Sequence, residues 1–130
     1  MKQSVSHYVM PDEKEEATAE LVHRLGLDGI ENLIYGDEPS SNLFTSLTVG
    51  AHLRFWPRWM DFYLGNTKRY KKQFPDEKAL TAYYGASDTD GWLEEIRKNI
   101  RAALAENPEY LVWHVADCTL EEAWTRQFYY

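Results

Sequence analysis

The chain has 130 residues, a formal net charge of −7 and an unusually aromatic composition, with five Trp, nine Tyr and five Phe. This length predicts one domain with a substantial core, and the acidic charge argues against binding nucleic acid through phosphate contacts. The single cysteine, Cys118, excludes an internal disulfide and favours a cytoplasmic location. The sequence shows no stretch typical of a membrane span or a signal peptide.

Residues 3–10 are rich in β-forming side chains and form the first expected strand. Pro11 and Asp12 then predict a helix in which Asp12 is the cap and Glu15 completes a capping box. Gly26 is expected to end this helix in the left-handed conformation. Its apolar residues share one face at helical spacing: Thr18, Leu21, Val22 and Leu25.

Two further strands follow, at residues 28–35 and 48–53, separated by a loop rich in turn-forming residues. Residues 54–90 are expected to form an aromatic loop insertion that contains one short helix, which starts near Pro75 and ends at Tyr84. Loops of this length are uncommon in compact domains and are often functional lids.

A clear helix is predicted over residues 91–106, and a fourth strand over residues 110–115. A last short helix is expected after Thr119. Alternating strands and helices indicate an α/β fold in which about four parallel strands carry helices on their outer face.

Two histidines, His52 and His114, follow apolar runs at matching places in the third and fourth strands. Glu31 is expected at the end of the second strand. Because functional groups in α/β folds gather where parallel strands end, we expect these three side chains to face one cleft as catalytic residues. They are suited to proton transfer next to a carbonyl, or to beginning a zinc or manganese site through His52 and His114. Taken singly, either histidine is as readily a structural residue.

Arg54, Trp56 and Trp59 are the expected substrate-binding residues at the start of the aromatic insertion. The planar guanidinium of Arg54 suits a phosphate or carboxylate, although a salt bridge to Asp61 or Glu31 explains it equally well. Indole rings stack on sugars, but they also anchor protein interfaces, and the interface is the preferred interpretation for the tryptophans.

Three segments together suggest a family. Gly26-Leu-Asp-Gly-Ile-Glu31 resembles the junction before the second strand of the xylose-isomerase-like TIM barrels. Val49-Gly-Ala-His52 and Tyr110-Leu-Val-Trp-His114-Val resemble that superfamily's third and fourth strands, each of which ends in a histidine. The superfamily includes sugar-phosphate isomerases, ketose epimerases and abasic-site nucleases of the endonuclease IV type.

The resemblance implies that this chain forms half of an eight-stranded barrel, since such barrels take about 250 residues. It implies a sugar isomerase or epimerase activity on a small carbohydrate, with Glu31 in the pocket and His52 and His114 beside the substrate or on a divalent metal. The superfamily's remaining metal ligands lie on strands five to eight of the barrel, and they have no counterpart in this sequence. The acidic charge disfavours the nuclease branch.

The alternative is a non-catalytic half-barrel. Four strands of a barrel leave two open edges and an inner face, so self-association into a homodimer would close the structure. In that case the aromatic residues 55–63 and 128–130 would cover the junction between the subunits.

Overall fold

The computed structural model describes residues 2–56, 59–65 and 74–114. The chain divides into two compact units, of which the first comprises Met1–Arg54 and Ile96–Trp113. The second comprises Phe55–Glu95 and continues from His114. The first unit holds the sheet and corresponds to the half-barrel expected from the sequence.

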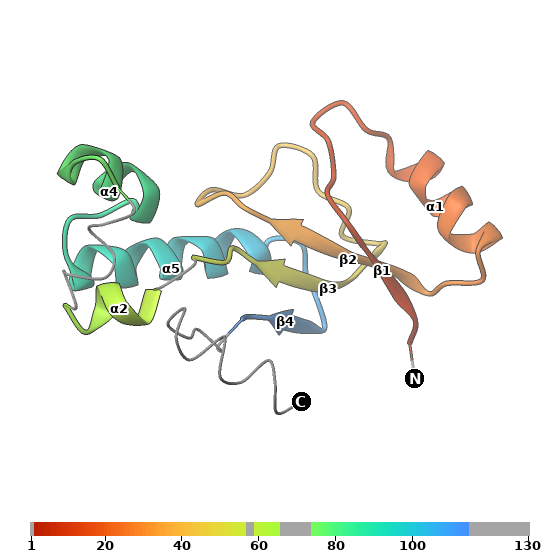
Figure 1. The fold of residues 1–130 in the computed structure, drawn as a ribbon. Helices are drawn as coiled ribbons and strands as arrows, with labels where there is room; N and C mark the ends of the chain where they lie inside the picture. The colour runs from red at the N-terminus through yellow and green to blue at the C-terminus, as the bar shows by residue number, and fades with distance from the viewer. Residues whose placement is uncertain (1, 57–58, 66–73, 115–130) are drawn as a thin grey trace. The chain divides into compact units, whose positions relative to one another are not determined.

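Four parallel strands form one sheet in sequential order, which confirms the predicted α/β fold (Figure 1). The sheet is open, as half a barrel would be. Its outer strands are shorter than predicted, and Val115 lies outside the described residues. The strands are β1 (Ser4–His7), β2 (Gly29–Ile34), β3 (Thr48–Leu53) and β4 (Tyr110–Val112).

Helix α1 (Glu15–Arg24) connects β1 to β2, and the predicted cap at Asp12 is wrong. Lys14 is the N-cap, and its side chain makes no capping hydrogen bond. The reason lies in the preceding turn, where the Glu13 N–H donates to the Met10 carbonyl oxygen at 3.1 Å and delays the start of the helix.

The end of α1 follows the prediction, with Gly26 at a φ of +70°. The Gly26 N–H donates to the His23 carbonyl, and the Leu27 N–H donates to the Val22 carbonyl, at 3.0 Å each. These two bonds make a Schellman motif, in which glycine is favoured because it has no Cβ to clash in the left-handed region.

The buried face of α1 is narrower than predicted. Thr18 and Val22 are buried, whereas the side chains of Leu21 and Leu25 are 45 % and 61 % exposed. A ten-residue helix lying on the first two strands of a sheet buries only one narrow stripe, so the neighbouring leucines face outward. Val22 belongs to a core cluster with these residues: Val9, Ile30, Phe44 and Leu47.

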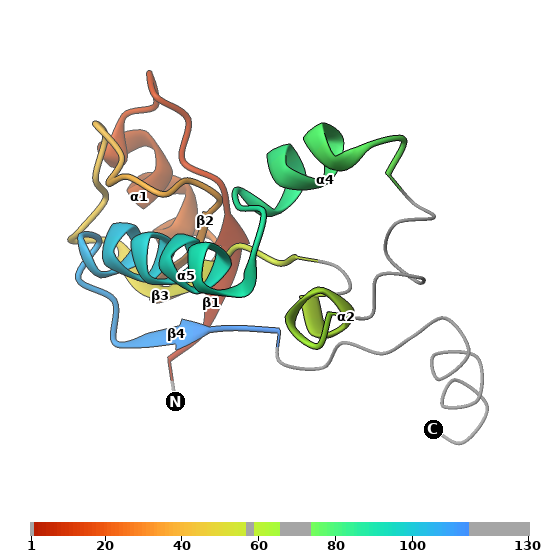
Figure 2. The same cartoon turned by 90° about the vertical axis from the view of Figure 1, so that its left-hand side faces the viewer.

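Helix α5 (Thr89–Leu104) packs its carboxyl-terminal part along β3 (Figure 2). Ala103 and Ile100 contact Ala51 and Leu53 of that strand. Ala51 pairs with Asn32, two residues beyond Ile30, so α1 and α5 cover the same face of the sheet. This is the outer face expected from the sequence.

The second unit is more regular than the predicted insertion. It contains α2 (Trp59–Tyr63), the expected helix α4 (Glu77–Tyr84) and the start of α5. Asp76 caps α4 by accepting a hydrogen bond from the Ala79 N–H at 2.8 Å, and Gly85 ends it at a φ of +76°. Aromatic rings pack against one another in this segment, with Phe62 stacked on Tyr84 and Trp59 stacked on Trp92. The helix expected after Thr119 lies outside the described residues.

Candidate functional site on the open face of the sheet

The register of the sheet places one residue from each strand in a row on the face opposite α1 and α5. Ser6 of β1 pairs with Glu31 of β2, Glu31 pairs with Gly50 of β3, and Gly50 pairs with Tyr110 of β4. Side chains alternate between faces along a strand, so residues paired in this way point to the same side. We call this side, away from the two helices, the open face.

A hydrogen-bonded network crosses the open face from β1 to β4. The Tyr110 hydroxyl donates to Glu31 Oε2 at 3.2 Å, and the Ser6 hydroxyl donates to Glu31 Oε1 at 3.4 Å. Ser4 Oγ lies 3.3 Å from Tyr110 Oη. Hydroxyl donors from strands on both sides therefore hold the Glu31 carboxylate in place.

Gly50 makes this network possible. Tyr110 and Glu31 belong to β4 and β2, so the phenol ring must cross β3 to reach the carboxylate. A Cβ atom placed on Gly50 would lie 2.4 Å from the Tyr110 ring. The glycine therefore provides the surface over which the ring lies.

Glu31 is the most versatile group in the row. A carboxylate offers about four lone-pair positions, and the two hydroxyl donors occupy two of them. Glu31 is partly exposed, and it can therefore accept further hydrogen bonds from a ligand that has several hydroxyl groups. It can also act as a general base.

Glu31 lies in the middle of β2 and not at its end, where it was predicted. His52 shares the open face with Glu31, one step nearer the carboxyl edge. It pairs with Leu33, which lies two residues beyond Glu31 on β2. Strand spacing puts the Glu31 and His52 Cα atoms about 8 Å apart, within reach of one small ligand. His52 Nδ1 lies 3.1 Å from the Leu53 carbonyl oxygen, and since a carbonyl can only accept, Nδ1 carries the proton. Nε2 is then the basic nitrogen of the ring.

The third predicted catalytic residue, His114, has a different setting. It lies two residues beyond β4 and not within a buried strand, because β4 ends at Val112 and is itself largely exposed. His114 belongs to the second unit, where its ring centroid is 5.3 Å from that of Phe55. A cleft shared by Glu31, His52 and His114 stays a prediction.

The predicted substrate-binding residues also fall in two units. The Arg54 backbone N–H donates to Asn99 Oδ1 at 2.9 Å at the end of β3. In the second unit Trp56 is only 2 % exposed and packs edge-on against Trp92. The Trp59 ring stacks on Trp92 with the centroids 5.6 Å apart. The two tryptophans are thus part of the core of that unit, and their contact with a substrate stays a prediction.

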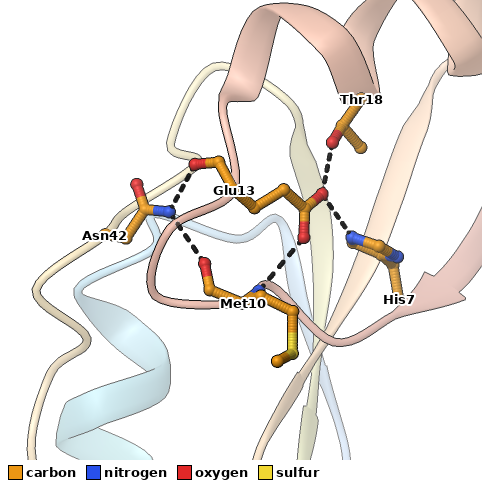
Figure 3. A network of polar contacts seen from close by, with 5 residues as sticks. All are labelled: His7, Met10, Glu13, Thr18 and Asn42. Carbon is orange, nitrogen blue, oxygen red and sulfur yellow. Dashed lines mark hydrogen bonds and ion pairs between the residues drawn. The ribbon is translucent and has the colours of Figure 1, made fainter.

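A second polar network fixes the chain beyond β1 (Figure 3). The Glu13 carboxylate lies 2.7 Å from His7 Nε2 and also accepts hydrogen bonds from the Thr18 hydroxyl and the Met10 N–H. The Asn42 amide donates to the Met10 and Glu13 carbonyl oxygens at 3.0 and 2.7 Å. His7 pairs with Asn32 and so points to the helical face, which gives this network a positioning role.

The charge on Glu13 is favoured by these contacts. Burial opposes the charged form, but the hydrogen bonds from Thr18 and Met10 and the contact with His7 outweigh burial and lower the pKa of Glu13. An ionised Glu13 therefore ties the end of β1 to the beginning of α1.

The sequence predicted Glu31 and His52 as site residues, and their role stays a prediction. Tyr110, Ser4 and Ser6, which contact Glu31 or its hydrogen-bond partner, were not predicted. Alternation along the strands would have placed both serines on one face once the register was known. The tyrosine at the start of β4 carried no local signal, since its partner lies 79 positions away in the sequence.

The described residues contain no group of three or more His, Cys, Asp or Glu side chains close enough to hold a metal ion. Zinc and manganese sites need at least three protein ligands in most cases. A zinc or manganese site begun by His52 and His114 stays a prediction.

Comparisons with known protein families, curated proteins and solved structures each found no match to this chain. The likeness to xylose-isomerase-like barrels thus rests on the three motif segments alone and stays a prediction. In the part of the chain that the structure describes, no helix has the length and apolar character needed to cross a membrane.

Proposed function

We propose that the open face binds a small carbohydrate and that Glu31 and His52 transfer a proton on it, as in a sugar isomerase or epimerase. The observation that carries this proposal is the Glu31 carboxylate, held on the open face by Tyr110 and Ser6. Hydroxyl-rich surroundings of this kind match the hydrogen-bonding groups of a sugar.

The chemistry requires a base that removes a proton from the carbon next to a carbonyl group. The electron pair left on carbon moves into the carbonyl and forms an enediolate. Protonation of the same carbon from the other side gives the epimer. Protonation of the former carbonyl carbon, with transfer of the neighbouring hydroxyl proton to the first oxygen, gives the isomer. Glu31 and His52 supply two bases on one face, so the proton taken by one can be replaced by a proton from the conjugate acid of the other.

This proposal assigns no step to a metal. The resemblance implies zinc or manganese, and such an ion would need ligands beyond the pair on the open face. Metal content of the purified protein, measured by mass spectrometry with Glu31→Gln and His52→Gln beside the unchanged chain, tests that implication. If the unchanged chain holds metal in a stoichiometric amount and each substitution removes it, the ion belongs to the site.

Titration of the labelled protein with simple sugars, followed by NMR, tests the proposed function. We expect amide shifts on β2 and β3 that saturate, and a loss of binding in Glu31→Gln. Glu20→Gln is the control, because Glu20 is an exposed glutamate on α1. Sugars that produce no shifts, or shifts that Glu31→Gln leaves unchanged, would contradict the proposal.

A second candidate is a non-catalytic half-barrel that forms a homodimer. The observation in its favour is that the helices of the first unit cover one face of the sheet, whereas parallel sheets are usually covered on both faces. Light scattering at micromolar concentration distinguishes the two. Self-association is supported if the unchanged chain is a dimer and Leu33→Asp, on the open face, is a monomer. If the unchanged chain is a stable monomer, self-association is excluded.

A further inference from the structure

A cleft of about 170 Å³ opens where β1 and β2 end, next to the open face. Its walls come from the residues that follow β1, the carboxyl half of β2 and the loop after β2. The polar side chains among its lining residues are Tyr8, Asn32, Tyr35, Glu38 and Ser40. A space of this size holds more than a single water molecule and admits part of a small ligand.

Two exposed tyrosines form one side of this cleft. Tyr8 directly follows β1 and Tyr35 directly follows β2, and their ring centroids are 5.6 Å apart at an interplanar angle of 45°. Both rings are about half exposed, at 48 % and 56 %. They therefore present aromatic surface to a ligand in the cleft.

The backbone around both tyrosines is held before any ligand arrives. Near Tyr8, the Glu13 carboxylate accepts from the Met10 N–H at 3.1 Å. Near Tyr35, the buried Asn99 amide donates to the carbonyl oxygens of Ile34 and Gly36 at 3.0 and 2.6 Å. Preorganisation of this kind lowers the entropy lost on binding.

The charge of the cleft limits what it can bind. Among the described residues that line it, none is Lys, Arg or His, and the one ionisable acid is Glu38. Phosphate groups are normally bound by Arg, Lys or helix N-termini. Aromatic faces, in contrast, attract cations, and a nearby carboxylate strengthens that preference.

We infer that this cleft binds an unphosphorylated sugar, and that an amino sugar binds it more tightly than the neutral sugar does. The inference rests on the proposed function, because the cleft is lined by Asn32 and Leu33, which directly follow Glu31 on β2. It narrows the substrate class to sugars without a phosphate group. The ammonium group of the ligand would lie against Tyr8 or Tyr35 and near Glu38.

Titration of the full chain with glucosamine, glucose and glucose 6-phosphate tests the inference, with NMR shifts of Tyr35 and Gly36 as the readout. The pH is chosen so that the amine is protonated. We expect glucosamine to bind most tightly and glucose 6-phosphate most weakly. Tyr35→Leu should raise the Kd for glucosamine about 2- to 5-fold.

The charge at Glu38 has a separate test. Glu38→Gln should remove the preference for glucosamine over glucose, and the exposed Glu20→Gln on α1 should retain it. Glucose 6-phosphate that binds as tightly as glucosamine would overturn the inference and leave the proposed function standing. The absence of binding by all three sugars would contradict both.

Discussion

The phenol ring of Tyr110 lies directly over Gly50, and its hydroxyl reaches Glu31 on the strand beyond, at 3.2 Å. The three residues come from β4, β3 and β2. A side chain at position 50 would occupy the place of the ring. The hydrogen bond between Tyr110 and Glu31 therefore depends on Gly50, although Gly50 makes no part of that bond.

Gly50→Ala should therefore break the contact without unfolding the sheet. The new Cβ would lie 2.4 Å from the far end of a flexible side chain, which can move aside. We expect the free energy of unfolding to fall by about 1 kcal/mol, the usual net contribution of one hydrogen bond. Urea denaturation of Gly50→Ala, Tyr110→Phe and the double variant measures the coupling between the two positions.

One result would contradict this prediction. If the double variant loses as much free energy of unfolding as the two single variants lose together, Gly50 does not support the Tyr110 contact. Gly36→Ala serves as the control, because a Cβ there meets its nearest atom at 3.6 Å, an ordinary contact.

Asn99→Asp should destabilise the protein by about 2–4 kcal/mol, since the buried side chain at position 99 would lose both of its hydrogen-bond donors. Asn99 is 2 % exposed, and its amide donates to Ile34 and Gly36 while its oxygen accepts from the Arg54 N–H. Aspartate has nearly the same shape but no amide hydrogens. Thermal and urea unfolding measure the loss. A variant as stable as the unchanged protein would show that these bonds contribute little.

Glu106 should make stability depend on pH. Its side chain is 0 % exposed, and burial raises its pKa despite the hydrogen bonds from Phe44, Thr48 and Asn32. A raised pKa favours the protonated folded state, so this contribution is complete below the ordinary glutamate pKa and is lost as the pH rises through the raised value. Urea unfolding between acidic and neutral pH should show the decline.

Two substitutions at Glu106 separate charge from hydrogen bonding. Glu106→Gln removes the ionisation but keeps an acceptor for the Phe44 N–H, which Glu106 Oε2 accepts at 2.9 Å. It should flatten the decline with pH. Glu106→Ala leaves the Phe44 N–H and the Thr48 hydroxyl without this acceptor and should cost about 2–4 kcal/mol at every pH. Equal pH profiles for Glu106→Gln and the unchanged protein would be evidence against the prediction.

Glu13 should have the opposite dependence. Its pKa is lowered, so its contribution is present above the ordinary glutamate pKa and is lost as the pH falls through the lowered value. Glu13→Gln should reduce the loss of stability between neutral pH and about pH 3. Glu16→Gln, at an exposed glutamate in the first turn of α1, should leave that loss unchanged. The same acid sensitivity in both variants would refute the role of Glu13.

Local sequence patterns were enough to predict the parallel sheet. Strand β3 begins and ends where alternation and apolar runs placed it, and Gly26 ends α1 as predicted. These features depend on side-chain alternation and glycine conformation, which act over a few residues. Strand periodicity also bears on the predicted site residues Glu31 and His52. Alternation decides which residues of one strand share a face, and the register between β2 and β3 then puts these two side chains on the same face.

The tertiary structure alone decided the partners of those residues. Tyr110 reaches Glu31 across 79 positions of sequence. Asn99 joins the ends of β2 and β3 from α5. Long-range hydrogen bonds of this kind leave no periodic trace, since each depends on the distance between elements that only packing sets. The start of α1 also differs from the prediction, because the backbone turn from Met10 to Glu13 precedes the helix and Lys14 becomes its N-cap.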